Sequence, residues 1–374
     1  MADKKLGGAG LRGQVAGETA LCTVGKSGTG LTYRGFDISV LAEKASFEEV
    51  AFLLLRGHLP TQLELDEYLD KIAQLRQLPR ALKDVLERLP ASAHPMDVMR
   101  TGCSVLGNLE TESDFKQQDE AIDRLLAVLP AIICYWYIFS HMGERIETQL
   151  DDKSIGAHFL HMLSGQRPSE LFSQVMNTSL ILYAEHEFNA STFTARVCAS
   201  TLSDIHSCIA GAIGSLRGPL HGGANEAAME MIQKWQSPDE AEQALLGMLD
   251  RKEKIMGFGH AIYRESDPRN VIIKRWAEKL ADSVGDTTLY PISVRCEEVM
   301  WREKRLFCNA DFFHASAYHF MGIPTKLFTP IFVMSRLTGW AAHVKEQRTN
   351  NRIIRPSADY TGPESSHWID ISDR

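Results

Sequence analysis

The sequence predicts a mainly α-helical protein with two domains and a small β-hairpin near its N-terminus. Helix-start signals recur along the chain, whereas no repeating alternation of strands and helices is present. The 374 residues exceed the usual size of one compact core, which favours two domains. A composition of 44% hydrophobic and 24% charged residues is typical of folded globular proteins.

The hairpin is predicted from two short apolar runs, residues 20–24 and 31–33, that flank a glycine-rich segment. The same region, through Lys26 and Ser27, also fits a permissive phosphate-loop pattern. A phosphate loop needs a helix that begins at this Lys-Ser pair, and the Gly-Thr-Gly that follows is poor helix-forming material. We therefore interpret the segment as a hairpin turn.

Capping residues predict the helices that follow. Ser46 and Thr61 each stand three residues before a glutamate, which is the arrangement of a capping box. The first of these helices is expected to stop at Gly57, and the second before Pro79. Three cap–proline pairs predict further helix starts: Ser237-Pro238, Asp267-Pro268 and Thr329-Pro330, the last opening a helix that runs to about Arg348.

The glycine-rich residues 214–223 predict a hinge between the two domains. We expect residues 1–220 to form the first part of a large helical domain, which residues 319–374 complete. Residues 221–318 would then form a smaller helical domain.

The bulk properties exclude several classes of protein. A net charge of −8 argues against a general nucleic-acid binder, although a local basic pocket for an anion stays open. Seven cysteines, an odd number without a Cys-x-x-Cys pair, favour reduced thiols in an intracellular compartment. The first ten residues contain no apolar run and predict no signal peptide. Residues 125–139, which include Pro130, are too short for a membrane span, so we expect a buried core helix.

Two further motifs carry little weight. Residues 8–13 formally fit a dinucleotide-binding fingerprint, but no strand precedes them and no strand–helix–strand unit follows. His158 and His161 could share one face of a helix, but no third ligand with zinc spacing is nearby. We expect neither a nucleotide site nor a metal site from these patterns.

Three polar clusters in the C-terminal half each place an acid–base side chain beside small or turn-forming residues. They contain His221 in residues 218–226, His260 in residues 257–260 and Asp311 in residues 309–312. Histidine changes charge near neutral pH, and glycine lets a backbone approach a ligand closely. Two histidines and a carboxylate presented in this way could act on a carbon acid.

Other readings of these residues stay open from the residues alone. The two histidines could be structural, and Asp311 could be only the N-cap of a helix that begins at Phe312. His314, one turn further on, is interpreted as mainly structural. Three arginines could likewise be solvated surface charges: Arg269, Arg336 and Arg355.

Taken together, the motifs resemble those of the citrate synthase superfamily over nearly the whole chain, from about Thr23 onward. They are residues 33–38 (YRGFDI), 186–193 (HEFNASTF), 218–226 (GPLHGGANE), 257–261 (GFGHA), 267–269 (DPR), 309–311 (NAD) and 338–343 (TGWAAH). Within the superfamily the chain is most similar to bacterial 2-methylcitrate synthases, in residues 20–28, 94–102 and 353–363.

The resemblance implies a role for each site residue. It makes Asp311 the base, His221 the donor to the thioester oxygen and His260 the group at the oxaloacetate carbonyl. Oxaloacetate would be bound by His186, Arg269, Arg336 and, from the neighbouring subunit, Arg355. Coenzyme A would contact Met256, Gly257, Phe258, Gly259, Ala261 and Arg264. Planar guanidinium groups suit the two carboxylates of oxaloacetate.

The resemblance also implies a two-domain citrate synthase-like fold and a cytoplasmic homodimer. The implied acyltransferase reaction condenses propanoyl-CoA with oxaloacetate, with acetyl-CoA as the alternative acyl donor. We expect no metal and no cofactor, because the coenzyme A thioester is itself a substrate, and no nucleic-acid or membrane partner. The N-terminal extension of the larger NADH-regulated citrate synthases is absent, so we expect no such regulatory site.

Two rivals come from other classes of protein. A helical binding protein without catalysis would have no use for His221, His260 and Asp311 together. A nucleotide hydrolase would use Lys26 and Ser27, and an ATP-binding titration would detect it.

Overall fold

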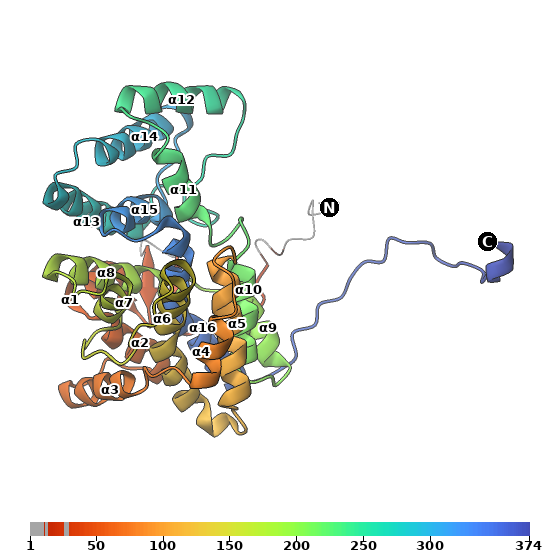
Figure 1. Ribbon diagram of the computed structural model, residues 1–374. Helices are drawn as coiled ribbons and strands as arrows, with labels where there is room; N and C mark the ends of the chain where they lie inside the picture. The colour runs from red at the N-terminus through yellow and green to blue at the C-terminus, as the bar shows by residue number, and fades with distance from the viewer. Residues whose placement is uncertain (1–10, 12–13, 26–29) are drawn as a thin grey trace.

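The computed structural model describes residue 11, residues 14–25 and residues 30–374, and these residues are predominantly helical (Figure 1). The α-helices are α1 (Ile38–Lys44), α2 (Phe47–Arg56), α3 (Gln62–Gln74), α4 (Arg80–Leu86), α5 (Pro95–Leu109), α6 (Gln118–Met142), α7 (Ile155–Ser164), α8 (Glu170–Tyr183), α9 (Ala190–Ser200), α10 (Ile205–Leu216), α11 (Ala224–Ile232), α12 (Pro238–Asp250), α13 (Pro268–Val284), α14 (Leu289–Lys304), α15 (Ala310–Phe320) and α16 (Phe328–Thr349). The short 3-10 helices are η1 (Phe115–Gln117), η2 (Thr325–Leu327) and η3 (Ile371–Asp373). The predicted mainly α class is confirmed. All seven cysteines are free thiols.

A small antiparallel sheet in the order β1-β2-β3 lies near the N-terminus. Its strands are β1 (Cys22–Val24), β2 (Leu31–Tyr33) and β3 (Phe36–Asp37). The predicted hairpin is confirmed, and β3 adds a third strand that the sequence analysis missed because it is only two residues long. The Tyr33 hydroxyl donates a 3.0 Å hydrogen bond to the Ile181 carbonyl, which ties the sheet to the end of α8. Lys26, Ser27 and most of residues 8–13 lie outside the described residues.

The predicted helix caps are present. Ser46 and Thr61 each make both hydrogen bonds of a capping box, at the starts of α2 and α3. Gly57 ends α2 in the left-handed conformation, with φ of 98°, which glycine adopts without a steric penalty. Ser237 caps α12 and Asp267 caps α13, each followed by proline in the first turn.

The start of α16 differs from the prediction. The helix begins at Phe328, with Leu327 as its cap residue, because the chain enters it directly from η2. Thr329 therefore does not act as the N-cap, and both its N–H and its hydroxyl donate to Glu226 Oε1 in α11. Pro330 sits in the first turn of α16, where a helix needs no backbone donor.

Two long helices, α6 and α16, run through the core of the larger part of the molecule. Nearly every residue of α16 from Phe328 to Val344 is buried, which is the pattern of a helix surrounded on all sides. Among the described residues, the segment Phe115–Met142 that contains α6 is the one helix long and apolar enough to cross a membrane. Within the protein, 72% of the most apolar 18-residue stretch of this helix is buried, as expected for the core helix of a folded domain.

Helices α11–α15 gather at one end of the molecule, and the other helices form the larger body below them (Figure 1). Within this smaller group α13 packs on α15 and α12 packs on α14, while α13 also contacts α1 and α8 of the body. The chain passes into the group through the turn after α10, and it leaves after α15. The predicted division at residues 220 and 318 stays a prediction, and residue 318 lies in the last turn of α15.

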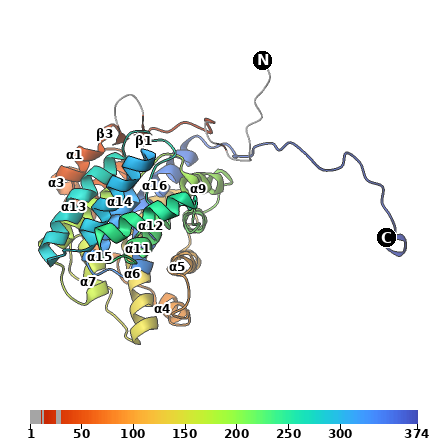
Figure 2. The same ribbon diagram turned by 90° about the horizontal axis from the view of Figure 1, so that it is seen from above.

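Residues 350–374 run away from the body as an extended, exposed tail (Figures 1 and 2). Ile354 N–H donates a 3.0 Å hydrogen bond to Ser200 Oγ and anchors the tail at its root. Beyond this point the side chains, including that of Arg355, are exposed.

Candidate active site

Asp311 lies in the first turn of α15, but it is not the N-cap of this helix. Asn309 is the N-cap, and its side chain accepts a 3.0 Å hydrogen bond from the N–H of Asp311. The Asp311 carboxylate is therefore free for another partner, and its Oδ1 accepts a 2.7 Å hydrogen bond from the Tyr183 hydroxyl. Burial raises the pKa of Asp311 to about 6, although the bond from Tyr183 opposes this shift. A carboxylate with a pKa near the working pH is suited to act as a general base.

His221 lies in the turn between α10 and α11 and faces Ser191 at the start of α9. Its Nε2 is 3.3 Å from the N–H of Ser191 and 2.8 Å from the Ser191 hydroxyl. A backbone N–H can only donate, so Nε2 is the acceptor and the ring proton is on Nδ1. Burial and the positive charge of Arg336 lower the pKa of His221 to about 4. At neutral pH the ring is therefore neutral, with Nδ1–H available as a donor.

His260 is held in the opposite tautomer. Its Nδ1 accepts hydrogen bonds from the N–H groups of Ile262 at 3.0 Å and Tyr263 at 3.3 Å. The ring proton is therefore on Nε2. Burial and the charge of Arg269 lower the pKa of His260 to about 4. This histidine is also a neutral hydrogen-bond donor.

His186 lies next to His260, in the turn between α8 and α9. Its Nε2 is 3.2 Å from the Tyr263 hydroxyl, and the centres of the two imidazole rings are 5.1 Å apart. Burial, followed by the charges of Arg269 and neighbouring groups, lowers the pKa of His186 well below its usual value. The structure thus brings both histidines to one place beside Tyr263.

Arg269 is buried and forms an ion pair with Asp267, the N-cap residue of its own helix α13. Its Nε and one terminal N–H donate to the two oxygens of Asp267 at 3.0 and 2.8 Å. Asp267 also accepts a 3.0 Å bond from the N–H of Ala310, which joins the starts of α13 and α15. Arg269 is thus fixed close to Asp311 and is not a solvated surface charge.

Arg336, in the middle of α16, is a buried cation of a different kind. Only 1% of its surface is exposed, and its Nε donates a 2.6 Å bond to the Tyr183 carbonyl. No carboxylate of the described residues lies within ion-pair distance of its guanidinium. Burial lowers the pKa of Arg336. A buried guanidinium without a carboxylate partner is costly in a folded protein, and an anionic ligand would remove that cost.

Three aromatic rings lie among these groups, Phe332 and Tyr183 in one cluster and Tyr263 in another. The ring centre of Phe332 is 4.3 Å from that of Tyr183 and 6.4 Å from that of His221, and Arg336 lies 4.7 Å over the same ring. Asp311, His221 and Arg336 thus surround Tyr183 and Phe332, while His186, His260 and Arg269 surround Tyr263. The charges of Arg269 and Asp267 shift the pKa values of both Asp311 and His260, which shows that the two groups are neighbours although their residues are far apart in sequence.

Four contributing residues were absent from the sequence prediction: Tyr183, Ser191, Tyr263 and Phe332. Ser191 belongs to the motif at residues 186–193, and Tyr183 stands three residues before that motif, so their position was a usable signal. Tyr263 likewise stands two residues after the motif at residues 257–261, whereas Phe332 has no such signal, because an isolated aromatic residue on a helix is most often core.

The loop that begins at Met256 rests against the start of α15. Gly257 has φ of 87°, and a Cβ at this position would lie 2.8 Å from the ring of Phe312. The N–H of Gly259 donates a 2.8 Å bond to the Phe307 carbonyl. Further along the loop, the predicted coenzyme A contacts Ala261 and Arg264 are exposed. Their role stays a prediction.

Arg355 and the histidine pair of α7 lie elsewhere. Arg355 is on the exposed tail, so the site within one chain does not contain it. His158 contacts the Thr148 carbonyl at 2.9 Å, and His161 contacts Asp152 at 2.8 Å. Across the described residues, no group of three side chains is arranged to hold a metal ion.

Comparison with known proteins identifies close relatives. The "Citrate synthase, C-terminal domain" family matches residues 10–357. The chain is 70% identical over 371 residues to the 2-methylcitrate synthase of Shewanella oneidensis, covering 99% of both chains. It is 43% identical over 352 residues to citrate synthase 2 of Bacillus subtilis, covering 92% of this chain and 93% of the relative. The citrate synthase of Thermoplasma acidophilum, solved as a ternary complex with carboxymethyl coenzyme A and oxaloacetate, has a TM-score of 0.91 at 30% identity, covering 97% of this chain and 98% of that one.

Proposed function

This chain belongs to the citrate synthase family, and from that premise we propose that it is an acyltransferase acting as a 2-methylcitrate synthase. It condenses propanoyl-CoA with oxaloacetate and hydrolyses the thioester, which releases 2-methylcitrate and coenzyme A. The observation that carries the reaction type is the buried carboxylate of Asp311, whose pKa is raised to about 6 beside two neutral histidines. The choice of acyl group is supported by the relative from Shewanella oneidensis.

Asp311 is the base in the first step. An α-proton of a thioester is weakly acidic, so its removal needs a base and a donor to the developing enolate oxygen at the same time. Asp311 takes the proton from the α-carbon of the acyl group, and His221 donates its Nδ1–H to the thioester oxygen. The fixed tautomer of His221 supports this role, because its other nitrogen already accepts from Ser191.

His260 acts at the carbonyl of oxaloacetate. When the enol carbon attacks that carbonyl carbon, negative charge develops on the oxygen, and the Nε2–H of His260 stabilises it. The proton on Nε2 is supported by the two backbone N–H groups that donate to Nδ1. Water then attacks the thioester carbonyl, and coenzyme A leaves as the thiol.

The carboxylates of oxaloacetate are bound by Arg269, Arg336 and, from a second copy of the chain, Arg355. The buried guanidinium of Arg336, which has a carbonyl partner but no carboxylate within ion-pair distance, supports an anion site within the chain. His186 completes this side of the site beside Tyr263. A site that needs Arg355 from elsewhere requires a homodimer, and the exposed position of Arg355 on its own chain supports that requirement.

Coenzyme A runs along the loop from Met256 to Ala261, and Arg264 meets its phosphates. Closure of the smaller helical group over oxaloacetate would exclude water and complete the coenzyme A contacts. Asp311, His221 and His260 supply the base and the two hydrogen-bond donors of the enolisation and condensation steps, and in the hydrolysis step the water molecule supplies the proton that the coenzyme A thiolate takes up. The proposed scheme therefore includes no metal and no cofactor. In the cell we place the reaction in the cytoplasm, as a step of propanoate breakdown through the 2-methylcitrate cycle.

The second candidate is a citrate synthase that uses acetyl-CoA. It is favoured by the similarity to citrate synthase 2 of Bacillus subtilis. The two acyl groups differ by one methylene, which is worth only about 0.8 kcal/mol of apolar transfer free energy. A small change in the acyl pocket is therefore enough to move the preference from one to the other.

The reaction is tested by mixing purified protein with propanoyl-CoA, with and without oxaloacetate. We expect release of coenzyme A thiol only when oxaloacetate is present, and 2-methylcitrate as the product identified by mass spectrometry. Thiol release without oxaloacetate would indicate a simple thioesterase and contradict the proposal.

A further inference from the structure

One turn, residues 184–189 between α8 and α9, carries or borders many of the site contacts. Tyr183 precedes it and donates to Asp311, His186 lies within it, and Ser191 follows it and contacts His221. The backbone of this turn therefore places His186 and joins the two helices that carry Tyr183 and Ser191. None of the proposed catalytic residues holds the backbone of this turn in place.

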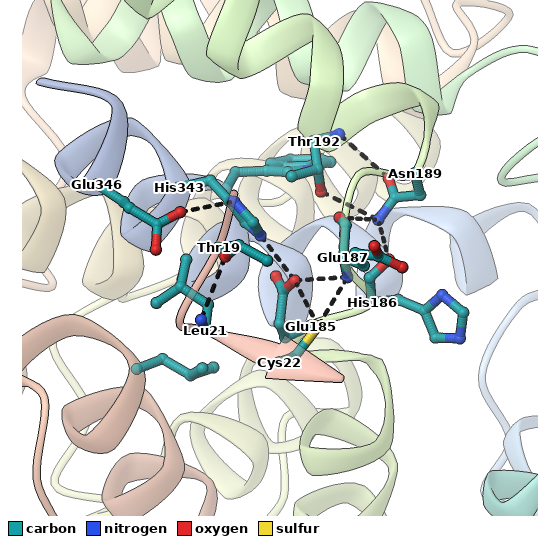
Figure 3. A network of polar contacts seen from close by, with 12 residues as sticks. Thr19, Leu21, Cys22, Glu185, His186, Glu187, Asn189, Thr192, His343 and Glu346 are labelled. Atoms are coloured by element: carbon teal, nitrogen blue, oxygen red, sulfur yellow. Dashed lines mark hydrogen bonds and ion pairs between the residues drawn. The ribbon is translucent and has the colours of Figure 1, made fainter. Parts of the chain in front are cut away.

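The turn holds a backbone conformation that it would not adopt unaided. Glu187 has φ of 54°, in the left-handed region that non-glycine residues rarely occupy. Its N–H donates a 2.7 Å hydrogen bond to Glu185 Oε1, and the Sγ of Cys22 in β1 lies 3.0 Å from the same nitrogen (Figure 3). The side chain of Glu185 thus closes the turn on itself.

Glu185 is in turn held from α16. Its carboxylate is fully buried, and Oε1 accepts a 2.8 Å bond from His343 Nε2 (Figure 3). His343 Nδ1 lies 2.9 Å from a terminal N–H of Arg196 in α9. A guanidinium can only donate, so Nδ1 is the acceptor and the proton on Nε2 points to Glu185. Arg196 thereby selects the tautomer of His343 that binds the turn.

The packing around these groups leaves little freedom for the carboxylate. A Cβ at Gly339, one turn before His343 on α16, would clash with Glu185 Oε2 and with the Ala184 carbonyl. Only glycine lets α16 approach the turn this closely. Arg196 also lies 4.6 Å over the ring of Phe188, which belongs to the same turn.

We propose that Arg196, His343 and Glu185, the turn relay, are positioning residues that set the place of His186 for oxaloacetate. The inference rests on the proposed function, because it concerns the same oxaloacetate site. None of the three residues has to touch the substrate. The relay acts by holding the Glu187 backbone in its strained conformation, and the ring of His186 follows from that backbone. The motif at residues 338–343 thus has a structural explanation. Gly339 allows α16 to pack closely against the turn, and His343 donates the hydrogen bond to Glu185.

The test compares two substitutions of one residue. His343→Leu removes the donor to Glu185, whereas His343→Gln keeps an N–H that can reach the same oxygen. We expect His343→Leu to raise the Kd of oxaloacetate about tenfold or more, measured by calorimetry without acyl-CoA, because small displacements of a binding group are costly. The KM of acyl-CoA at saturating oxaloacetate should change less than about threefold. His343→Gln should restore oxaloacetate binding to within about threefold of the wild type.

A matched control separates positioning from general loss of stability. Arg348 lies on the same helix and forms a buried ion pair with Glu112, away from the turn. Arg348→Met should lower the unfolding temperature while leaving the Kd of oxaloacetate unchanged. If it raised the Kd as much as His343→Leu at an equal loss of stability, the relay would be only structural. A wild-type Kd in His343→Leu would overturn the proposal outright.

If His343→Leu does not fold, Arg196→Met decides the question. This variant keeps His343 but removes the donor that selects its tautomer, and we expect the Kd of oxaloacetate to rise about threefold to tenfold. An unchanged Kd would contradict the relay. Failure of the wild-type protein to bind oxaloacetate would instead overturn the proposed function, and the relay would fall with it.

Discussion

The two sides of the proposed site differ in how far one chain completes them. On the oxaloacetate side, His186, Arg269 and Arg336 are buried, and each has a fixed hydrogen-bond partner. On the coenzyme A side, Ala261 and Arg264 are exposed on a loop. Arg355, which we propose for the oxaloacetate side of a second chain, is on the tail that leaves the body.

This difference indicates an order of events. A preorganised side binds its ligand without ordering new groups, whereas an exposed loop must be ordered when its ligand arrives. We therefore expect oxaloacetate to bind the free protein, and acyl-CoA to bind more tightly once oxaloacetate is present. Asp311 is the proposed base and binds neither substrate in the scheme, so its substitution separates binding from chemistry.

The largest effect is expected for Asp311→Asn, which keeps the size of the side chain but removes its basicity. The kcat should fall by roughly 10²–10⁴, the range for a positioned acid–base group, while the Kd of oxaloacetate stays near that of the wild type. Steady-state kinetics and calorimetry on one preparation measure both. Near-normal turnover would show that another group removes the proton.

A matched pair of arginine substitutions compares the two sides directly. Arg336→Leu removes a buried donor to the proposed anion, so the Kd of oxaloacetate should rise about 10- to 100-fold per lost charge-assisted bond. Arg264→Leu removes an exposed charge, so the KM of acyl-CoA should rise less than about tenfold. Equal effects of the two substitutions would show that the oxaloacetate side is not preorganised.

The role of Arg355 is checked by mixing chains that are inactive for different reasons. A dimer of one Asp311→Asn chain and one Arg355→Ala chain would hold one site with both defects and one site with neither. After complete subunit exchange in an equal mixture, about a quarter of the sites should be intact, because half of the dimers are mixed. Verified mixed dimers that regain no activity would show that Arg355 does not act across an interface.

The smallest effect is expected for Tyr183→Phe. The pKa of Asp311 is about 6, so the rate should fall as the pH drops below that value and the carboxylate becomes protonated. The Tyr183 hydroxyl lowers this pKa through its hydrogen bond, so its removal should move the acidic limb of the pH–rate profile to higher pH, by about half a unit to one unit. A shift to lower pH would contradict the proposed tuning of the base.

The sequence predicted those parts of the fold that depend on local chemistry. The caps at Ser46, Thr61, Ser237 and Asp267 are local hydrogen-bond patterns, and the structure has all of them. The start of α16 was misplaced because the chain enters the helix directly from η2, and Thr329 bonds instead to Glu226, about a hundred residues away in the chain. Such a partner has no local signature.

The candidate site shows the same limit. His221, His260 and Asp311 could be selected from their glycine-rich or turn-forming surroundings and from family resemblance. Their tautomers and pKa values could not, because they depend on Ser191, on Tyr183 and on the backbone of residues 262–263, which only the fold brings near. Asp311 is an example: the sequence allows it to be the N-cap of a helix, whereas in the structure Asn309 is the N-cap of α15.

A 2-methylcitrate synthase can be distinguished from a citrate synthase by a competition in one tube. Equal concentrations of propanoyl-CoA and acetyl-CoA are supplied with oxaloacetate, and 2-methylcitrate and citrate are quantified early in the reaction. The ratio of the two initial rates equals the ratio of the two kcat/KM values. We predict a ratio above one in favour of 2-methylcitrate. A tenfold or greater excess of citrate would contradict this prediction and identify the chain as a citrate synthase that uses acetyl-CoA.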